Sequence, residues 1–196
     1  MTDPKPETLD DTQVIEKCLE GDLGYYNEIV NRYENMVFNL AFRVMKNRQD
    51  AEDVAQEVFI NAFNHLSSYN SKYKLSTWLL KITKNQALYR LRGMKNLPKA
   101  SEDLELLTAH QDREVPHSAG MNPEAEAQRS EFKEIVTEIL NSLPDKYRLT
   151  LTLRHMFERS YQDIADILDM NLGTVKTNIH LGRKLLRERL EARKMI

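Results

Sequence analysis

The segment from Ser160 to Arg189 constrains the fold most strongly, because it predicts two short helices joined by a tight turn. Ser160 and Asp163 form the capping-box spacing typical of a helix start, and Asn171 is a good N-cap for the second helix. The residues expected to be buried recur at helical spacing: Ile164, Ala165, Ile167 and Leu168 in the first helix, and Val175, Ile179, Gly182 and Leu186 in the second. Ala165 and Gly182 are small, as closely crossing helices require. We therefore predict a helix-turn-helix.

The outer face of the second helix is polar and basic, which favours DNA binding. From Lys176 to the end there are seven Lys or Arg and two acids, a local net charge of +5 on a chain whose total is −2. Phosphate binding depends on such local charge, and a helix of this kind fits the major groove with its first turns towards the bases. The alternative is a bundle helix whose charged face is merely solvated. The candidate DNA contacts are Thr174, Lys176, Thr177, His180, Arg183, Lys184 and Arg187.

A second basic stretch indicates a surface for single-stranded nucleic acid. No Asp or Glu occurs from His65 to Ser101, whereas eight Lys or Arg do, for a net charge of +8. Cations hold phosphates and aromatic rings stack on unpaired bases. Trp78 is interpreted as a core residue, and the loop tyrosines as available for stacking. The candidates are Tyr69, Asn70, Lys72, Tyr73, Lys74, Lys81, Lys84, Asn85 and Arg92.

The rest of the chain is also predicted to be helical, which gives an all-α fold. One helix should begin near Val14 and another at Tyr25. Asp50 is expected to cap a third helix, which leaves Asp53, Gln56 and Glu57 on its outer face. From the pattern alone, plain solvation is the ordinary explanation of such a face. Ser76 or Thr77 should begin a fourth. Its expected buried side is Trp78, Leu79, Ile82 and Tyr89, and its expected outer cations include Lys81, Lys84 and Arg90.

Proline and glycine divide the chain into two predicted domains, residues 1–95 and 123–196, joined by a flexible linker over 96–122 that holds a possible helical piece at 104–107. Asn122 and Pro123 resemble the cap and first position of a helix. The alternation in LTLTL, residues 149–153, could indicate a strand. Helical spacing of Leu149, Leu153 and Met156 favours a helix instead.

Composition excludes several classes of protein. The lone Cys18 rules out an internal disulfide and fits a reducing cytoplasm. An acidic, polar N-terminus and the lack of a long apolar run indicate neither a signal peptide nor membrane insertion. We find no phosphate-binding glycine loop, no Cys/His cluster and no nucleophile–base arrangement, so neither an enzyme nor a cofactor is expected.

Three stretches in this order, DAEDVAQEVFINAF, TWLLKITKNQ and the segment from LPDKYRLTLTL to GTVKTNIHLGRKLLRERL, resemble bacterial sigma factors of the extracytoplasmic-function (ECF) type. The likeness covers roughly residues 10–95 and 123–191. It implies a specificity subunit of RNA polymerase whose two domains correspond to sigma regions 2 and 4.

The resemblance also implies roles for the candidate residues. Asp53, Gln56 and Glu57 would dock on the β′ clamp of core RNA polymerase. The 65–76 loop and the helix after it would read and open the −10 element. The helix-turn-helix would read the −35 element of promoter DNA, with the β flap on the same domain, and an anti-sigma factor would hold the chain inactive. The alternatives are a stand-alone helix-turn-helix regulator and a helical interaction protein.

Overall fold

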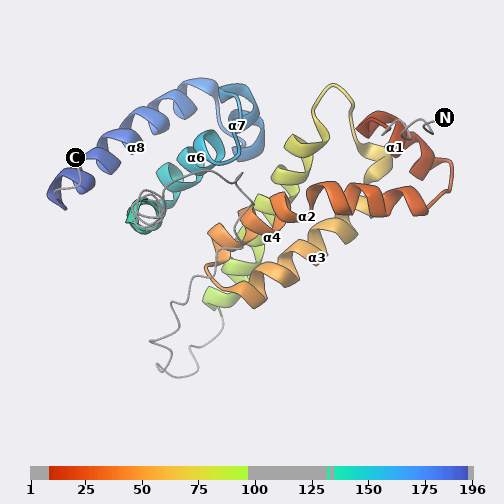
Figure 1. The fold of residues 1–196 in the computed structure, drawn as a ribbon, viewed down its shortest axis with the longest axis horizontal. Helices are drawn as coiled ribbons and strands as arrows, with labels where there is room; N and C mark the ends of the chain where they lie inside the picture. The colour runs from red at the N-terminus through yellow and green to blue at the C-terminus, as the bar shows by residue number, and fades with distance from the viewer. Residues whose placement is uncertain (1–8, 97–131, 133–134, 194–196) are drawn as a thin grey trace, which may run out of the picture.

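The computed structural model describes residues 9–96, 132 and 135–193, and all of its regular elements are helices. Figure 1 shows two groups of helices. The first group consists of α1 (Asp11–Leu19), α2 (Gly24–Met45), α3 (Arg48–Asn64), the short 3₁₀ helix η1 (Leu66–Ser68) and α4 (Leu75–Asn96). The second consists of a helical stretch over 135–142, α6 (Asp145–His155), α7 (Tyr161–Leu168) and α8 (Leu172–Ala192). The predicted all-α, two-domain fold is confirmed.

In the first domain α2, α3 and α4 pack against one another, and α1 lies along α2 (Figure 1). Each helix buries one apolar stripe. Fully buried Leu40, Val54 and Leu79 come from α2, α3 and α4 respectively. Burying such side chains is worth roughly 1.5–3 kcal/mol each, so this shared core holds the three helices together. The Tyr26 hydroxyl adds a link by donating to the carbonyl of Phe59 at 2.6 Å.

The second domain confirms both predicted caps. Ser160 and Asp163 form the capping box of α7, and the Asn171 side chain accepts from the amide of Thr174 at the start of α8. The LTLTL stretch is helical, as preferred, and its three leucines are buried together with the two threonines between them. A strand would have placed one of these two sets in solvent.

Several local predictions were wrong. Helix α3 is capped by Asn47, whose side chain accepts from the amide of Asp50, so Asp50 lies in the first turn. Helix α4 begins at Leu75, before either predicted start. Tyr89, predicted to be buried, is 73% exposed.

Some predictions concern parts of the chain that lie outside the described residues. These are the linker over 96–122, apart from the helical Asn96, its possible helical piece at 104–107, and the Asn122–Pro123 helix start. Within the described ranges, no helix is both long and apolar enough to cross a membrane.

The two domains meet through α4 and α7, which lie against each other. Polar side chains make several of its contacts. Lys84 of α4 reaches Asp169 at the end of α7, and Arg159 donates to the hydroxyl of Ser76 at 2.7 Å. This packing sets the surroundings of the candidate site described below.

Gly182 allows α8 to pack closely against α6, which generates a stability prediction. A Cβ placed there would lie 3.0 Å from Leu151 Cδ1 and 3.3 Å from Tyr147 Cβ. Gly182→Val should therefore destabilise the protein by about 1–3 kcal/mol through overpacking. Gly173→Ala is the control, because its Cβ would meet only Asn171 Oδ1 at 3.4 Å. Chemical denaturation measures both; equal stability of the two variants would contradict the prediction.

Candidate nucleic-acid interfaces

The outer face of α8 is exposed as predicted. Val175, Ile179 and Gly182 are buried against the rest of the domain, and Leu186 is half-buried. One side chain departs from the expected pattern: Asn178 is only 6% exposed and its amide nitrogen lies 3.6 Å from the sulfur of Met170. All seven candidate contacts stand on the solvent side, namely Thr174, Lys176, Thr177, His180, Arg183, Lys184 and Arg187.

Local hydrogen bonds fix the first turn of this helix. The Thr174 hydroxyl lies 2.9 Å from Asn171 Oδ1, and the Thr177 hydroxyl donates to the carbonyl of Gly173 at 3.0 Å. The two threonines are therefore held in defined rotamers. Lys176 and His180 lie in the same first turns and are exposed, so a DNA groove could reach them.

Arg183 is held by a contact from another helix. Its Nε and terminal nitrogen lie 3.4 Å and 3.3 Å from Nε2 of His155, at the end of α6. Burial of the imidazole, followed by the nearby Arg183 and Arg154, lowers the pKa of His155 below its ordinary value. A neutral imidazole can accept from Arg183, so the guanidinium is oriented by the fold. Sequence spacing gave no sign of this pair, whose members are 28 residues apart.

The loop before α4 is ordered by its own side chains. Tyr69 donates to the carbonyl of Tyr73 at 2.5 Å, and its ring lies 5.4 Å from the ring of Trp78. Asn70 Oδ1 accepts from the amide of Lys72 at 3.0 Å. Tyr69 and Trp78 are thus half-buried together, whereas Tyr73 is 52% exposed, and Asn70, Lys72 and Lys74 are exposed. Of the two loop tyrosines, Tyr73 offers the accessible ring.

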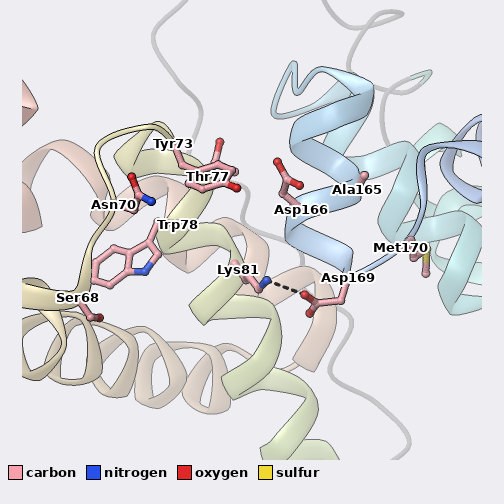
Figure 2. Close-up of a pocket in the computed structure, with 10 residues that line it drawn as sticks. All are labelled: Ser68, Asn70, Tyr73, Thr77, Trp78, Lys81, Ala165, Asp166, Asp169 and Met170. Carbon is pink, nitrogen blue, oxygen red and sulfur yellow. Dashed lines mark ion pairs between the residues drawn. The ribbon is translucent and has the colours of Figure 1, made fainter.

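This loop forms one wall of a cleft of about 450 Å³, shown in Figure 2. Asn70, Tyr73 and Trp78 lie on one side, while Asp166 and Asp169 of the second domain lie on the other. The cleft therefore combines an aromatic, amide-bearing wall with an acidic wall. The remaining lining residues are Ser68, Thr77, Lys81, Ala165 and Met170.

Two lysines of α4 are paired with a carboxylate of the second domain. Lys84, expected on the outside, is only 7% exposed, and its Nζ pairs with Asp169 at 2.9 Å. Lys81 pairs with the same carboxylate at 2.6 Å. The prediction for Lys84 was wrong because α7, far away in the sequence, covers it. Asn85 and Arg92 are exposed as expected.

Arg90 was also expected on the outside, but it joins α4 to the acidic face of α3. It lies 2.7 Å from Asp53, 3.3 Å from Asp50 and 3.4 Å from Glu57. Asp53 and Glu57 nevertheless keep about half of their side-chain surface exposed, at 46% and 43%, and Gln56 is exposed. The predicted acidic face exists, and Arg90 of α4 neutralises part of its negative charge.

Comparison with known families accounts for both domains. Residues 29–96 match the family described as Sigma-70 region 2, and residues 133–186 match Sigma-70, region 4. Two solved structures share the fold, each with a TM-score of 0.63. One is CnrH in complex with the cytosolic domain of CnrY, at 18% identity over 91% of this chain and 96% of that one. The other is RpoE in complex with the anti-sigma factor NepR from Bartonella quintana, at 21% identity over 85% and 96%.

Curated relatives extend this likeness along nearly the whole chain. The ECF RNA polymerase sigma factor SigW of Bacillus subtilis is 34% identical over 90% of this chain and 94% of its own length. The ECF RNA polymerase sigma-E factor of Haemophilus influenzae is 32% identical over 94% of this chain and 97% of its own length. With an all-helical fold, two matched sigma regions and an exposed recognition helix, this chain belongs to the extracytoplasmic-function family of RNA polymerase sigma factors.

Proposed function

We propose that this chain binds core RNA polymerase and directs promoter-specific initiation by reading the −35 element with α8 and the −10 element with α4 and the loop before it. The observation that carries the proposal is the exposed, basic face of α8 on a chain whose two domains match sigma regions 2 and 4. A stand-alone helix-turn-helix regulator would have no use for a domain that matches sigma region 2.

Contacts on α8 divide by their position along the helix. Lys176, Thr177 and His180 lie in the first turns and are assigned to bases, since the N-terminal part of a recognition helix enters the groove. Arg187 lies further along and is assigned to phosphate. Arg183, oriented by His155, lies between them and reaches the groove margin.

The −10 strand is assigned to the cleft wall made by Asn70 and Tyr73. Asn70 uses its carbonyl oxygen within the loop, which leaves its amide nitrogen to donate to a base edge. The exposed ring of Tyr73 supplies a stacking surface. Lys72 and Lys74 flank the wall and are assigned to phosphates, as are Lys81 and Lys84 once their carboxylate partner withdraws.

Docking on the polymerase is assigned to the outer face of α3. Asp53 lies one helical turn before Gln56 and Glu57, so the three side chains share that face and can meet a basic or polar partner together. The two-domain chain is proposed to act in the cytoplasm, where promoters are transcribed. We also propose an anti-sigma partner, because structural neighbours are complexes, one of them with the anti-sigma factor NepR.

Run-off transcription with reconstituted core polymerase tests the function and the recognition helix together. Lys176→Ala should weaken binding to a matched −35 element by about 1–3 kcal/mol and relax the base preference at that element. Arg187→Ala should weaken binding to all sequences more evenly and lower the salt dependence by about one charge. A native chain that supports no initiation with core would refute the function; unaltered −35 selectivity in both variants would refute the assignment on α8.

The α3 face predicts a loss of core binding when its charge is removed. Asp53→Asn with Glu57→Gln should weaken affinity for core about fivefold or more, equivalent to about 1 kcal/mol. Arg90→Gln is the matched control, since it breaks the same internal ion pairs and leaves both carboxylates in place. Titration by fluorescence anisotropy measures both. Equal losses in the two proteins would mean that only the helix packing matters.

Substitutions in the loop before α4 should impair opening of the DNA strands at the −10 element. Asn70→Ala with Tyr73→Ala should reduce permanganate reactivity of −10 thymines about tenfold, because each lost stacking contact is worth about 1–3 kcal/mol. Closed-complex binding should change little. Ser71→Ala, in the same exposed loop, is the control. Normal opening by the double variant would place the captured base elsewhere.

A further inference from the structure

A carboxylate of the second domain pairs with Lys81 and Lys84, two of the cations proposed to bind the −10 strand. Asp169 accepts from Lys81 with one carboxylate oxygen at 2.6 Å (Figure 2). Its other carboxylate oxygen accepts from Lys84 at 2.9 Å. These hydrogen bonds, from Lys81 first and Lys84 second, lower the pKa of Asp169, so the carboxylate is charged at neutral pH. A buried lysine needs such a partner, and the carboxylate stands where a phosphate would otherwise be.

Further polar contacts extend along the same side of α4. Thr77 donates to Asp163 at 3.2 Å, and Ser76 accepts from Arg159 at 2.7 Å. Residues 77, 81 and 84 are four and three positions apart, so they share one helical face. The covered face is therefore the one that carries the proposed −10 cations.

The acidic side of the cleft strengthens this cover. Asp166 and Asp169 face Asn70 and Tyr73 across it (Figure 2). A DNA strand that entered to reach those two residues would bring its phosphates towards two carboxylates. Like charges repel in such confinement, so α7 must move before the strand binds.

The −35 surface is not covered. Lys176, Thr177, His180 and Arg187 are all exposed while α7 rests on α4. The two DNA surfaces of the chain are thus in opposite states: one open, and one closed by the same domain that carries the open one.

We propose that α7 is a built-in cover for the −10 surface, with Asp169 as its charged latch, so that the chain free of polymerase binds −35 duplex but not the −10 strand. This inference rests on the proposed −10 role of Lys81 and Lys84. The latch is ionic, and Asp169 and Lys81 are both partly exposed, so salt weakens it. Separation of the domains releases both lysines in one step.

Asp169→Asn tests the latch. Asp169 has a left-handed backbone, φ 54°, at the C-cap of α7, and asparagine tolerates that conformation. The substitution removes the charge and keeps the shape. Asp166→Asn is the matched control. It makes the same change of charge in the same cleft, at a carboxylate that accepts from Gln162 on its own helix.

Two measurements on the full chain separate the outcomes. Energy transfer between dyes at Gln49→Cys and Glu191→Cys, with Cys18→Ala, reports domain separation. Asp169→Asn should lower the transfer, as should raised salt on the native chain, and Asp166→Asn should not. Affinity of the free protein for a −10 single strand should rise roughly fivefold for Asp169→Asn, equivalent to about 1 kcal/mol. The gain for Asp166→Asn should be clearly smaller, because that change lowers the repulsion without releasing the lysines. Affinity for a −35 duplex should change by less.

Unchanged energy transfer in Asp169→Asn would overturn the latch and leave the proposed function standing. Equal gains in strand affinity for both variants would also overturn it, since charge alone would then explain them. Lower transfer without any gain in strand affinity would overturn the −10 assignment of Lys81 and Lys84, and the cover with it.

Discussion

Helix α4 and the loop before it contain no carboxylate, so the cations of this stretch find their counter-ions on other elements or on DNA. Arg90 takes its partners from α3, and this fixes α3 against α4. Lys81 and Lys84 take theirs from α7, and this brings the second domain onto the first. The exclusion of acids from one segment thereby shapes the packing of three helices.

The same constraint relates stability to function. An ion pair within the protein and a lysine–phosphate contact use the same charge, so a cation engaged in one is withdrawn from the other. Arg90 is held by three carboxylates around it, which suits a structural role. Lys81 and Lys84 share a single carboxylate, which a polyanion can replace more readily. The number of partners therefore distinguishes Arg90 from the two lysines that we propose contact nucleic acid.

Sequence reasoning succeeded where the determinants are local. The caps at Ser160 and Asn171 depend on side chains within three residues, and both were confirmed. The exposed face of α8 could be predicted from the helical spacing of the apolar residues within that helix. Reasoning failed where burial depends on the packing of distant elements. Lys84 is covered by α7, about 85 residues away in the sequence. Tyr89 keeps the helical spacing of a buried residue but is exposed. Asn47 was missed as a cap because Asp50, close by, has the same capping chemistry.

The buried side of α8 bears on how promoter preference can change over evolution. Lys176, which we propose contacts a base, is exposed, so it can be replaced without disturbing the packing of the helix. Asn178 and Gly182 are different, since they set the distance of α8 from Met170 and from Leu151. A larger side chain at Gly182 would crowd Leu151 and Tyr147, so α8 would have to shift against α6 and carry its exposed residues with it. Gradual divergence among relatives should therefore proceed through the solvent side, and abrupt shifts in the recognised sequence through the packed side.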